Sequence, residues 1–447
     1  MSSPSVTETG PFHLTGNFAP VFEERTDVDL GVTGAIPPEL SGRFFRNGSN
    51  PRTGRSEHWF LGNGMLHGVE LCGGRATWYR NRYVRTPLFF DPEAPRVGPD
   101  GRLDRSVSLA NTHVVCHAGR ILALEEGSFP WLVSPELETL GVHDFGGKLS
   151  TAMTAHPKIC PETGELLFFG YGILPPYLVY HRVGRDGALV QSEEIQVVGP
   201  TMMHDFNVTR NHVIFMDLPL IFDLELAGRG GFPVRWSDDH GARLGVMPRN
   251  GTNDDVVWYP IDPCYVFHPM NAYEEGDRIV IDVARSQKLA FGPDDAEGEP
   301  PLLHRWIIDR AAGKVIEQPI DDRPAEFPRV ADDTVGRDHR FGYMLSIGEE
   351  THDVGRELFK YDRHADRSWT CSFGPGFAAA EPVFAAGASD GAEDEGYILT
   401  FVYDAARDRS DLVIVDATEF EKGPVARIHL PCRVPHGFHG SWIPDPL

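Results

Sequence analysis

Residues 267–284 read FHPMNAYEEGDRIVIDVA, and the pattern of this stretch recurs along the chain. A histidine stands in an apolar segment, the turn-forming residues EEGDR follow, and the β-branched run RIVIDVA comes next. Short apolar runs that meet at a Gly-containing turn are typical of β-hairpins. The stretch therefore predicts two paired strands, with His268 near the start of the first.

Similar runs on both sides of this stretch predict an all-β protein. They are HVVCH (113–117), ILALEE (121–126), ELLFFGYG (165–172), HVIFMDL (212–218), YILTFVYD (397–404) and DLVIVDA (411–417). The 47 glycines and 36 prolines are spread at short intervals rather than gathered in one linker, and convincing amphipathic helices are few. A chain of 447 residues is longer than a β-sandwich usually is, which favours a β-propeller.

We therefore expect a single propeller domain over residues 1–447, with residues 1–30 as an N-terminal arm over its outside. The number of blades does not follow from these runs, because no clean tandem repeat is visible.

The composition limits the classes of partner. A formal charge of −24 argues against nucleic acid, whose phosphates need clustered Lys and Arg, and against tight binding to anionic lipid.

No apolar window approaches the roughly 18 residues of a membrane helix. The start, MSSPSVTETG, lacks the basic and apolar regions of a secretory signal. The six cysteines form no CxxC pair, so free thiols and a cytoplasmic location are expected.

Four histidines occupy apolar settings in four distant motifs: TAHPK (His156), MMHDF (His204), FHPMNAYE (His268) and GFHGSW (His439). Neutral imidazole is the commonest metal ligand in proteins. The innermost strands of a propeller meet at one axis, so ligands from several blades could share one metal ion.

Alternatives remain open at this point. Histidines on apolar strands could simply pack in the core. His436, three residues before His439, competes for the last ligand position, and His113 and His117, which flank a strand, stay ambiguous.

Three glutamates in apolar surroundings favour the metal hypothesis: Glu126 in LALEE, Glu326 in AEFPRV and Glu381 in EPVF. A metal-bound histidine usually donates its other ring N–H to a carboxylate or carbonyl. Four imidazoles would leave an octahedral ion one or two open positions. Structural zinc sites usually contain Cys, catalytic zinc keeps three protein ligands, and a two-histidine, one-carboxylate set is absent. Iron(II) is therefore favoured over copper, zinc or manganese.

Several ordered motifs make the chain resemble the carotenoid cleavage oxygenase family from about residue 18 to residue 445. They are FFRNGSNP (44–51), HWFLGNGMLHG (58–68), YRNRYVRT (79–86), the four histidine motifs, the segment 381–404 and VPHGFHGSW (434–442). Members of that family are seven-bladed β-propellers with a dome of loops, and they hold iron(II) on four histidines, three of them backed by glutamates. The resemblance implies that His156, His204, His268 and His439 are the catalytic iron ligands, with Glu126, Glu326 and Glu381 behind them. It also selects His439 over His436.

The resemblance further implies that iron and dioxygen cleave a carbon–carbon double bond of a conjugated, lipophilic substrate into two carbonyl products, without an organic cofactor. The residues agree, since they show no arrangement for a nucleophile or a proton relay. The protein would bind the metal, align the alkene and exclude water. The family also contains an isomerohydrolase, and a metal-free propeller that serves as a binding scaffold is an alternative from another class.

The substrate class depends on Glu125. Stilbene-cleaving members look to have a lysine at this position, immediately before the first of the three glutamates. A carboxylate cannot replace an ammonium that faces a phenolate, so a carotenoid or apocarotenoid is favoured, with a stilbene or alkenylphenol as the alternative. Phe267 is a second candidate for a substrate contact.

Four apolar, Pro-punctuated segments are candidates for a substrate tunnel or for a transient contact with a membrane surface. They are residues 86–92, 127–133, 172–180 and 216–226. Ordinary anchoring of loops in the core is the alternative. The sequence gives no indication of an oligomeric state.

Overall fold

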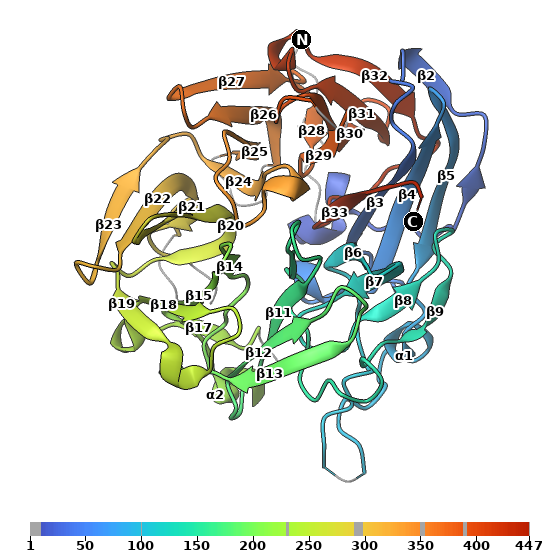
Figure 1. Ribbon diagram of the computed structural model, residues 1–447. Coiled ribbons are helices and arrows are strands. Elements are labelled where there is room, and N and C mark those ends of the chain that lie inside the picture. Colours follow the sequence, from blue (N-terminus) through green and yellow to red (C-terminus); the bar gives the residue numbers. More distant parts are fainter. Residues whose placement is uncertain are drawn as a thin grey trace.

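Seven β-sheets surround a central axis in the computed structural model, which describes residues 10–99, 101–228, 232–289, 298–348, 354–387 and 391–446 (Figure 1). Helices are few and short in this part of the chain. The structure confirms the predicted all-β class and the seven-bladed propeller.

The blades follow one another along the chain, each with its innermost strand given first. The first contains β33 (Gly440–Pro444), β3 (Gly42–Ser49), β4 (Gly64–Cys72), β5 (Arg75–Tyr83) and the edge strand β1 (Thr26–Asp27). The second contains β6 (His113–His117), β7 (Arg120–Leu124), β8 (Trp131–Val133) and β9 (Thr139–Val142). The third contains β10 (Lys158–Ile159), β11 (Leu166–Tyr171), β12 (Leu178–Val183) and β13 (Leu189–Glu194).

The fourth blade contains β14 (Asn207–Val208), β15 (His212–Asp217), β18 (Arg243–Pro248) and β19 (Val257–Pro260), with the hairpin β16 (Leu220–Phe222) and β17 (Val234–Trp236) inserted. The fifth contains β20 (Tyr265–Glu275), β21 (Arg278–Ser286), β22 (Leu302–Asp309) and β23 (Lys314–Pro319). The sixth contains β24 (Ala325–Arg329), β25 (Phe341–Ile347), β26 (Val354–Asp362) and β27 (Arg367–Ser372). The seventh contains β29 (Val383–Ala386), β28 (Phe377–Ala379), β30 (Gly396–Asp404), β31 (Arg409–Asp416), β32 (Pro424–His429) and the edge strand β2 (Gly31–Gly34).

The short helices are α1 (Pro87–Phe90), α2 (Leu224–Gly228), and the 3₁₀ turns η1 (Phe12–Leu14), η2 (Gly16–Phe18), η3 (Trp59–Leu61), η4 (Asp238–His240), η5 (Asn253–Asp255), η6 (Asp332–Thr334) and η7 (Phe420–Lys422).

The hairpin predicted for residues 267–284 is formed by β20 and β21 of the fifth blade. Its turn contains Gly276 with φ +61°, a left-handed conformation that glycine adopts without a steric penalty. The register of the two strands shifts on both sides of Pro269, which has no N–H to donate to the ladder. His268 therefore lies at an irregularity of an inner strand, where the chain faces the axis.

The ring is closed by strands from distant parts of the chain. β33 pairs antiparallel with β3, from Gly42 opposite Pro444 to Arg46 opposite Gly440. β2 pairs with β32 at the outer edge of the seventh blade. The first and last blades are thus each completed by a strand from the other end of the described chain.

The core lies between neighbouring sheets. Between the fourth and fifth blades, Leu244, Ile279 and Ile281 pack around Trp306, and all four are fully buried. Each such aliphatic side chain contributes about 1.5–3 kcal/mol when it leaves water. These interfaces hold the inner strands in place around the axis.

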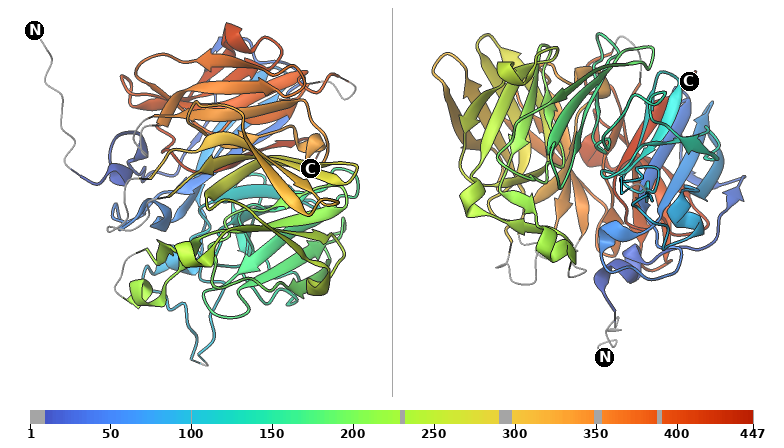
Figure 2. Two further views of the ribbon diagram at one scale, coloured as in Figure 1. Left: turned by 90° about the vertical axis from the view of Figure 1, so that its left-hand side faces the viewer. Right: turned by 90° about the horizontal axis from the view of Figure 1, so that it is seen from below.

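The two ends of the axis differ. Figure 2 shows the N-terminal turns, α1 and α2 at one end, which we call the helix-capped end, whereas the C-terminal strand reaches the other, which we call the open end. Phe90 and Leu224 in α1 and α2 are 68% and 58% exposed. Within the described ranges, no helix combines the length and the hydropathy that a bilayer span requires.

Candidate metal centre

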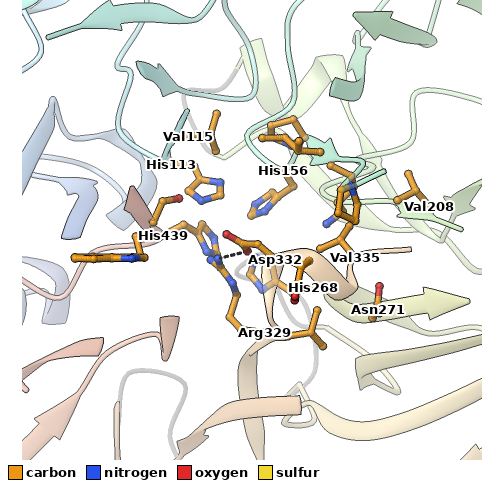
Figure 3. A pocket seen from close by; sticks show the side chains of 18 of the residues that line it. His113, Val115, His156, Val208, His268, Asn271, Arg329, Asp332, Val335 and His439 are labelled. Carbon is orange, nitrogen blue, oxygen red and sulfur yellow. Dashed lines mark ion pairs between the residues drawn. The ribbon is translucent and has the colours of Figure 1, made fainter. Parts of the chain in front are cut away.

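The four histidines of the distant motifs lie together on the axis. His156, His204 and His439 stand just before the inner strands β10, β14 and β33, and His268 lies in β20. All four are buried, and a candidate ligand atom from each lies within 4.8 Å of the others. The ring centroids of neighbouring members are 4.5–4.9 Å apart. Figure 3 shows His156, His268 and His439 pointing toward a common centre.

Three of the rings are oriented by the three predicted glutamates. His268 Nδ1 lies 2.7 Å from Glu326 Oε2, and His439 Nδ1 lies 2.9 Å from Glu381 Oε1. His204 Nδ1 contacts Glu126 Oε1. An ionised carboxylate can only accept, so a ring that faces one carries its proton on Nδ1 and directs Nε2 at the centre.

The fourth ring, His156, has a different partner. The carboxylate closest to it among the described contacts is Asp205, whose Oδ2 lies 3.8 Å from His156 Nδ1. Asp205 is in turn held by Lys158 Nζ at 2.8 Å and by the Phe206 N–H. Asp205 and Lys158 were not among the residues predicted from the sequence. Their only signal is that they lie beside the histidines in HDF and HPK.

Each glutamate is fixed by a further donor. The Tyr171 hydroxyl donates to Glu126, and the Phe327 N–H donates to Glu326. Glu381 accepts from the Gly440 N–H at 2.7 Å and from Arg329 Nη1 at 3.2 Å. Tyr171 and Arg329 were also missed, because nothing in their local sequence distinguishes them from other strand residues.

Burial sets the protonation of most of the rings. It lowers the pKa of His156 and His439 well below the ordinary value and lowers that of His268 to about 3. Burial alone would lower the pKa of His204 too, but the Glu126 carboxylate raises it. Burial also raises the pKa of Glu326 to about 8. Neutral imidazole is the form that binds metal ions.

One contact brings two of the ring nitrogens close together. His204 Nε2 and His268 Nε2 lie 3.1 Å apart, and the Nδ1 of each ring faces a glutamate. Two lone pairs at this distance repel unless one ring gains a second proton or a cation lies between them. Adjacent ligands of an octahedral ion at metal–nitrogen distances of about 2.1 Å would be about 3.0 Å apart. His156 Nε2 is also buried, with no hydrogen-bond partner in the described structure.

The other candidate histidines take different positions. His436 is buried away from the centre, stacked on Trp59 with a centroid distance of 5.7 Å. His117 Nε2 bonds the Gly164 carbonyl. His113 lies beside the cluster, with its ring centroid 5.2 Å from that of His439, and its Nδ1 donates to the Ala155 carbonyl.

Glu125 precedes Glu126 in the chain and Phe267 precedes His268, but the two side chains make different contacts. Glu125 Oε2 accepts hydrogen bonds from Ser108 Oγ at 2.8 Å and from the Leu109 N–H at 2.5 Å. Its carboxylate therefore anchors the segment before β6. The Phe267 ring meets that of His204 edge-on, with centroids 5.0 Å apart.

A cavity of about 580 Å³ reaches the histidines along the axis, and we call it the axial cavity. It is lined by His156, His268 and His439, by His113 on β6, and by residues of η6. Asp332, at the start of η6, projects into it (Figure 3).

Comparisons with known proteins agree along almost the whole chain. A family profile described as RPE65, retinal pigment epithelial membrane protein, matches residues 18–444. The chain is 37% identical to a carotenoid cleavage oxygenase of Mycobacterium tuberculosis, over 99% of this chain and 100% of the relative.

Solved structures are similar as well. The lignostilbene dioxygenase of Pseudomonas brassicacearum superposes with a TM-score of 0.89 at 30% identity, over 99% of this chain and 100% of that chain. A cobalt-substituted apocarotenoid oxygenase (ACO) of Synechocystis superposes with a TM-score of 0.84 at 28% identity, over 95% of this chain and 97% of that chain.

Proposed function

Since the chain belongs to the RPE65/carotenoid cleavage oxygenase family, we propose that it is a non-haem iron(II) dioxygenase. In this proposal it cleaves a carbon–carbon double bond of a carotenoid or apocarotenoid with O2 and releases two carbonyl products. His156, His204, His268 and His439 hold the iron, and Glu126, Glu326 and Glu381 orient three of the rings.

The observation that carries the proposal is the 3.1 Å contact between His204 Nε2 and His268 Nε2, in rings whose Nδ1 atoms each face a glutamate. Four neutral nitrogen donors with no carboxylate among them leave positions free on an octahedral ion. When bound, iron(II) supplies the chemistry that lets dioxygen attack an electron-rich alkene.

The residues around the four histidines position the substrate and exclude water from the site. Phe327 stacks on His268 with a centroid distance of 5.5 Å and lies 5.3 Å from His439, while Phe267 covers His204. Aromatic walls of this kind exclude water and bind a conjugated substrate through its apolar surface. The three glutamates fix the rings before the substrate arrives, so their orientation does not have to change during the reaction.

Glu125 supports the carotenoid or apocarotenoid assignment. Its carboxylate is held by Ser108 and Leu109, and it places a negative charge where a phenolate would need a cation. An apolar polyene has no such requirement.

A stilbene or alkenylphenol is the second candidate, and Arg96 is the observation that favours it. Arg96 Nη1 lies 3.9 Å from Glu125 Oε1, so a cation is available beside the carboxylate. A neutral phenol hydroxyl could donate to Glu125 while Arg96 balances the charge. The likeness to a lignostilbene dioxygenase also supports this alternative.

For location and partners, we propose a cytoplasmic enzyme whose exposed apolar residues at the helix-capped end, such as Phe90 and Leu224, touch membranes transiently to collect substrate. All six cysteines are free thiols, which supports a reducing compartment. Nucleic acid is not a partner in this proposal, given the charge of −24.

The test is a substrate panel. Apo-protein is loaded anaerobically with iron(II) and given carotenoids, apocarotenals and hydroxystilbenes under ¹⁸O₂, and the aldehyde products are identified by mass. Labelled apocarotenoid aldehydes are the expected products. Cleavage of hydroxystilbenes alone would favour the second candidate. A folded protein that binds iron but cleaves nothing would indicate a binding scaffold or an isomerase instead.

A further inference from the structure

The surroundings of the four histidines are chemically different toward the two ends of the axis. On the helix-capped side, Trp59 of η3 and Phe60 contact Phe438, the neighbour of His439, with centroid distances of 4.8 and 5.6 Å. Phe18 of η2 packs on Trp59 at 5.4 Å. A hydrated metal ion moving between these rings would lose water ligands without gaining replacements, which is costly.

The axial cavity also has many apolar lining residues, but it differs in carrying charged side chains. Its lining includes four carboxylates, Asp205, Asp332, Asp333 and Glu381, against the two cations Lys158 and Arg329. Lys158 is paired with Asp205, and Arg329 with Glu381. The two aspartates of η6 are the charge in excess, so the cavity carries a net negative charge.

The η6 aspartates stand where an ion from solvent would meet them first. The Asp332 side chain is 72% exposed, and its Oδ1 lies 3.7 Å from Arg329 Nη2, a weak contact. Asp333 is exposed too and has no ion pair in the described part of the chain. A cavity with walls of low dielectric constant focuses the field of such charges and concentrates counter-ions.

His113 supplies a donor deeper in the cavity. It is only 8% exposed, lines the cavity, and gives its Nδ1–H to the Ala155 carbonyl at 2.8 Å. Its neutral ring therefore presents a lone pair at Nε2, and this buried atom has no hydrogen-bond partner among the residues described. The ring centroid lies 5.2 Å from that of His439 and 5.9 Å from that of His156. Figure 3 shows His113 beside these two ligands.

We propose that the axial cavity is the route by which a divalent metal ion reaches the four histidines, with Asp332 and Asp333 attracting it at the open end and His113 binding it transiently on the way. Carboxylate oxygens and then an imidazole nitrogen replace the waters of the ion stepwise before the final ligands do. The inference rests on the proposed metal site.

The rate of metal uptake tests this route. Chelator-stripped full-length protein is mixed anaerobically with Co²⁺ in a stopped-flow instrument, uptake is followed by visible absorption, and the final content is measured by elemental analysis. The double variant Asp332→Asn/Asp333→Asn should load roughly 3- to 10-fold more slowly at low salt. Asp333→Lys should be slower still. Both should reach the same final content, and the differences should shrink at high salt.

His113→Gln should also slow uptake while the final content stays at one ion per chain. The matched control is Asp238→Asn/Asp239→Asn, which removes an equal charge from the 3₁₀ turn η4, outside the cavity lining. This control should load at the unaltered rate.

Unchanged rates in both η6 variants would overturn the route, as would an equal slowing in the η4 control. Those outcomes leave the proposed function intact, because the protein still binds metal. A protein that takes up no Co²⁺ or Fe²⁺ under any condition would instead overturn the proposed function, and the route with it.

Discussion

Arg329 Nη1 lies 3.2 Å from Glu381 Oε1, the same oxygen that accepts the Nδ1–H of His439 at 2.9 Å. The guanidinium, from the sixth blade, also donates to the Gly440 carbonyl at 3.1 Å. Arg329 thus holds both the carboxylate that orients His439 and the backbone beside that histidine. A residue outside the histidine cluster therefore contributes to the order of the site.

Replacing Arg329 with Met should therefore leave the Glu381 carboxylate buried without its cation. We expect the free energy of unfolding of the apo-protein to fall by about 3 kcal/mol in urea titrations. Arg210→Met is the matched control, because Arg210 and its partner Glu162 both reach solvent, so the loss there should be much smaller. Equal losses in the two variants would contradict this account of Arg329.

The choice between the two C-terminal histidines can be measured directly. His439→Ala removes a member of the cluster, whereas His436→Ala removes a ring that stacks on Trp59. Metal content after anaerobic loading should fall strongly in the first variant and stay at one ion per chain in the second. Retention of full metal content by His439→Ala would show that the fourth ligand is misassigned.

Tyr171 should tune metal affinity from a distance. Its hydroxyl fixes Glu126, which in turn orients His204. Tyr171→Phe should weaken Co²⁺ binding by about 10-fold in chelator competition, the size of effect that partners behind the ligands usually have. Tyr180→Phe removes the hydroxyl of another buried tyrosine, one without a hydrogen-bond partner in the described structure, and should leave affinity unchanged. Equal Co²⁺ affinities of Tyr171→Phe and Tyr180→Phe would show that the Tyr171 hydroxyl does not contribute to metal binding.

A pH-dependent contribution to stability is expected from Glu274 at the end of β20. Burial would raise the pKa of its carboxyl, but hydrogen bonds from His212, Thr209 and Asn211 hold that pKa well below the ordinary value. A lowered folded-state pKa stabilises the protein above the unfolded-state pKa of about 4.3, and this contribution is lost as the pH falls further.

Glu274→Gln should accordingly lower the free energy of unfolding by about 1–2 kcal/mol at pH 7. The difference from the unaltered protein should shrink as urea titrations are repeated below pH 4. Glu275→Gln, next in sequence and exposed, provides the control and should change little at any pH. A Glu274→Gln effect that stays constant with pH would mean that the carboxylate charge is not responsible.

The all-β class and the seven-bladed propeller could be inferred before the structure, the former from the runs themselves and the latter with the family resemblance. The four distant histidine motifs could also be assigned to one axis. Few residue types bind metal ions, so histidines in apolar settings stand out in the sequence. The runs alone could not give the number of blades, since strands of different blades share only their hydrophobic pattern and not a repeated sequence.

Tyr171, Arg329 and Asp205 escaped prediction for a physical reason. Each acts through a contact with a residue far away in the chain or through a second side chain, and Tyr and Arg are ordinary residues of half-buried strands. The pairing of β33 with β3 is similarly non-local, as it joins residues about 400 positions apart. The axial cavity depends on η6, whose aspartates read in sequence as a simple solvent-exposed turn.

The position of His439, immediately before β33, links metal supply to the integrity of the ring. β33 is the strand that completes the first blade, so the seam between β33 and β3 is where the ring would open. An ion shared by His439 with His156, His204 and His268 would connect this seam to the third, fourth and fifth blades. Because such an ion would bind only the closed ring, it would stabilise the closed ring by mass action. Without metal, the β33–β3 seam would open more often and expose the chain to proteases. The abundance of the protein in a cell would therefore follow the metal supply.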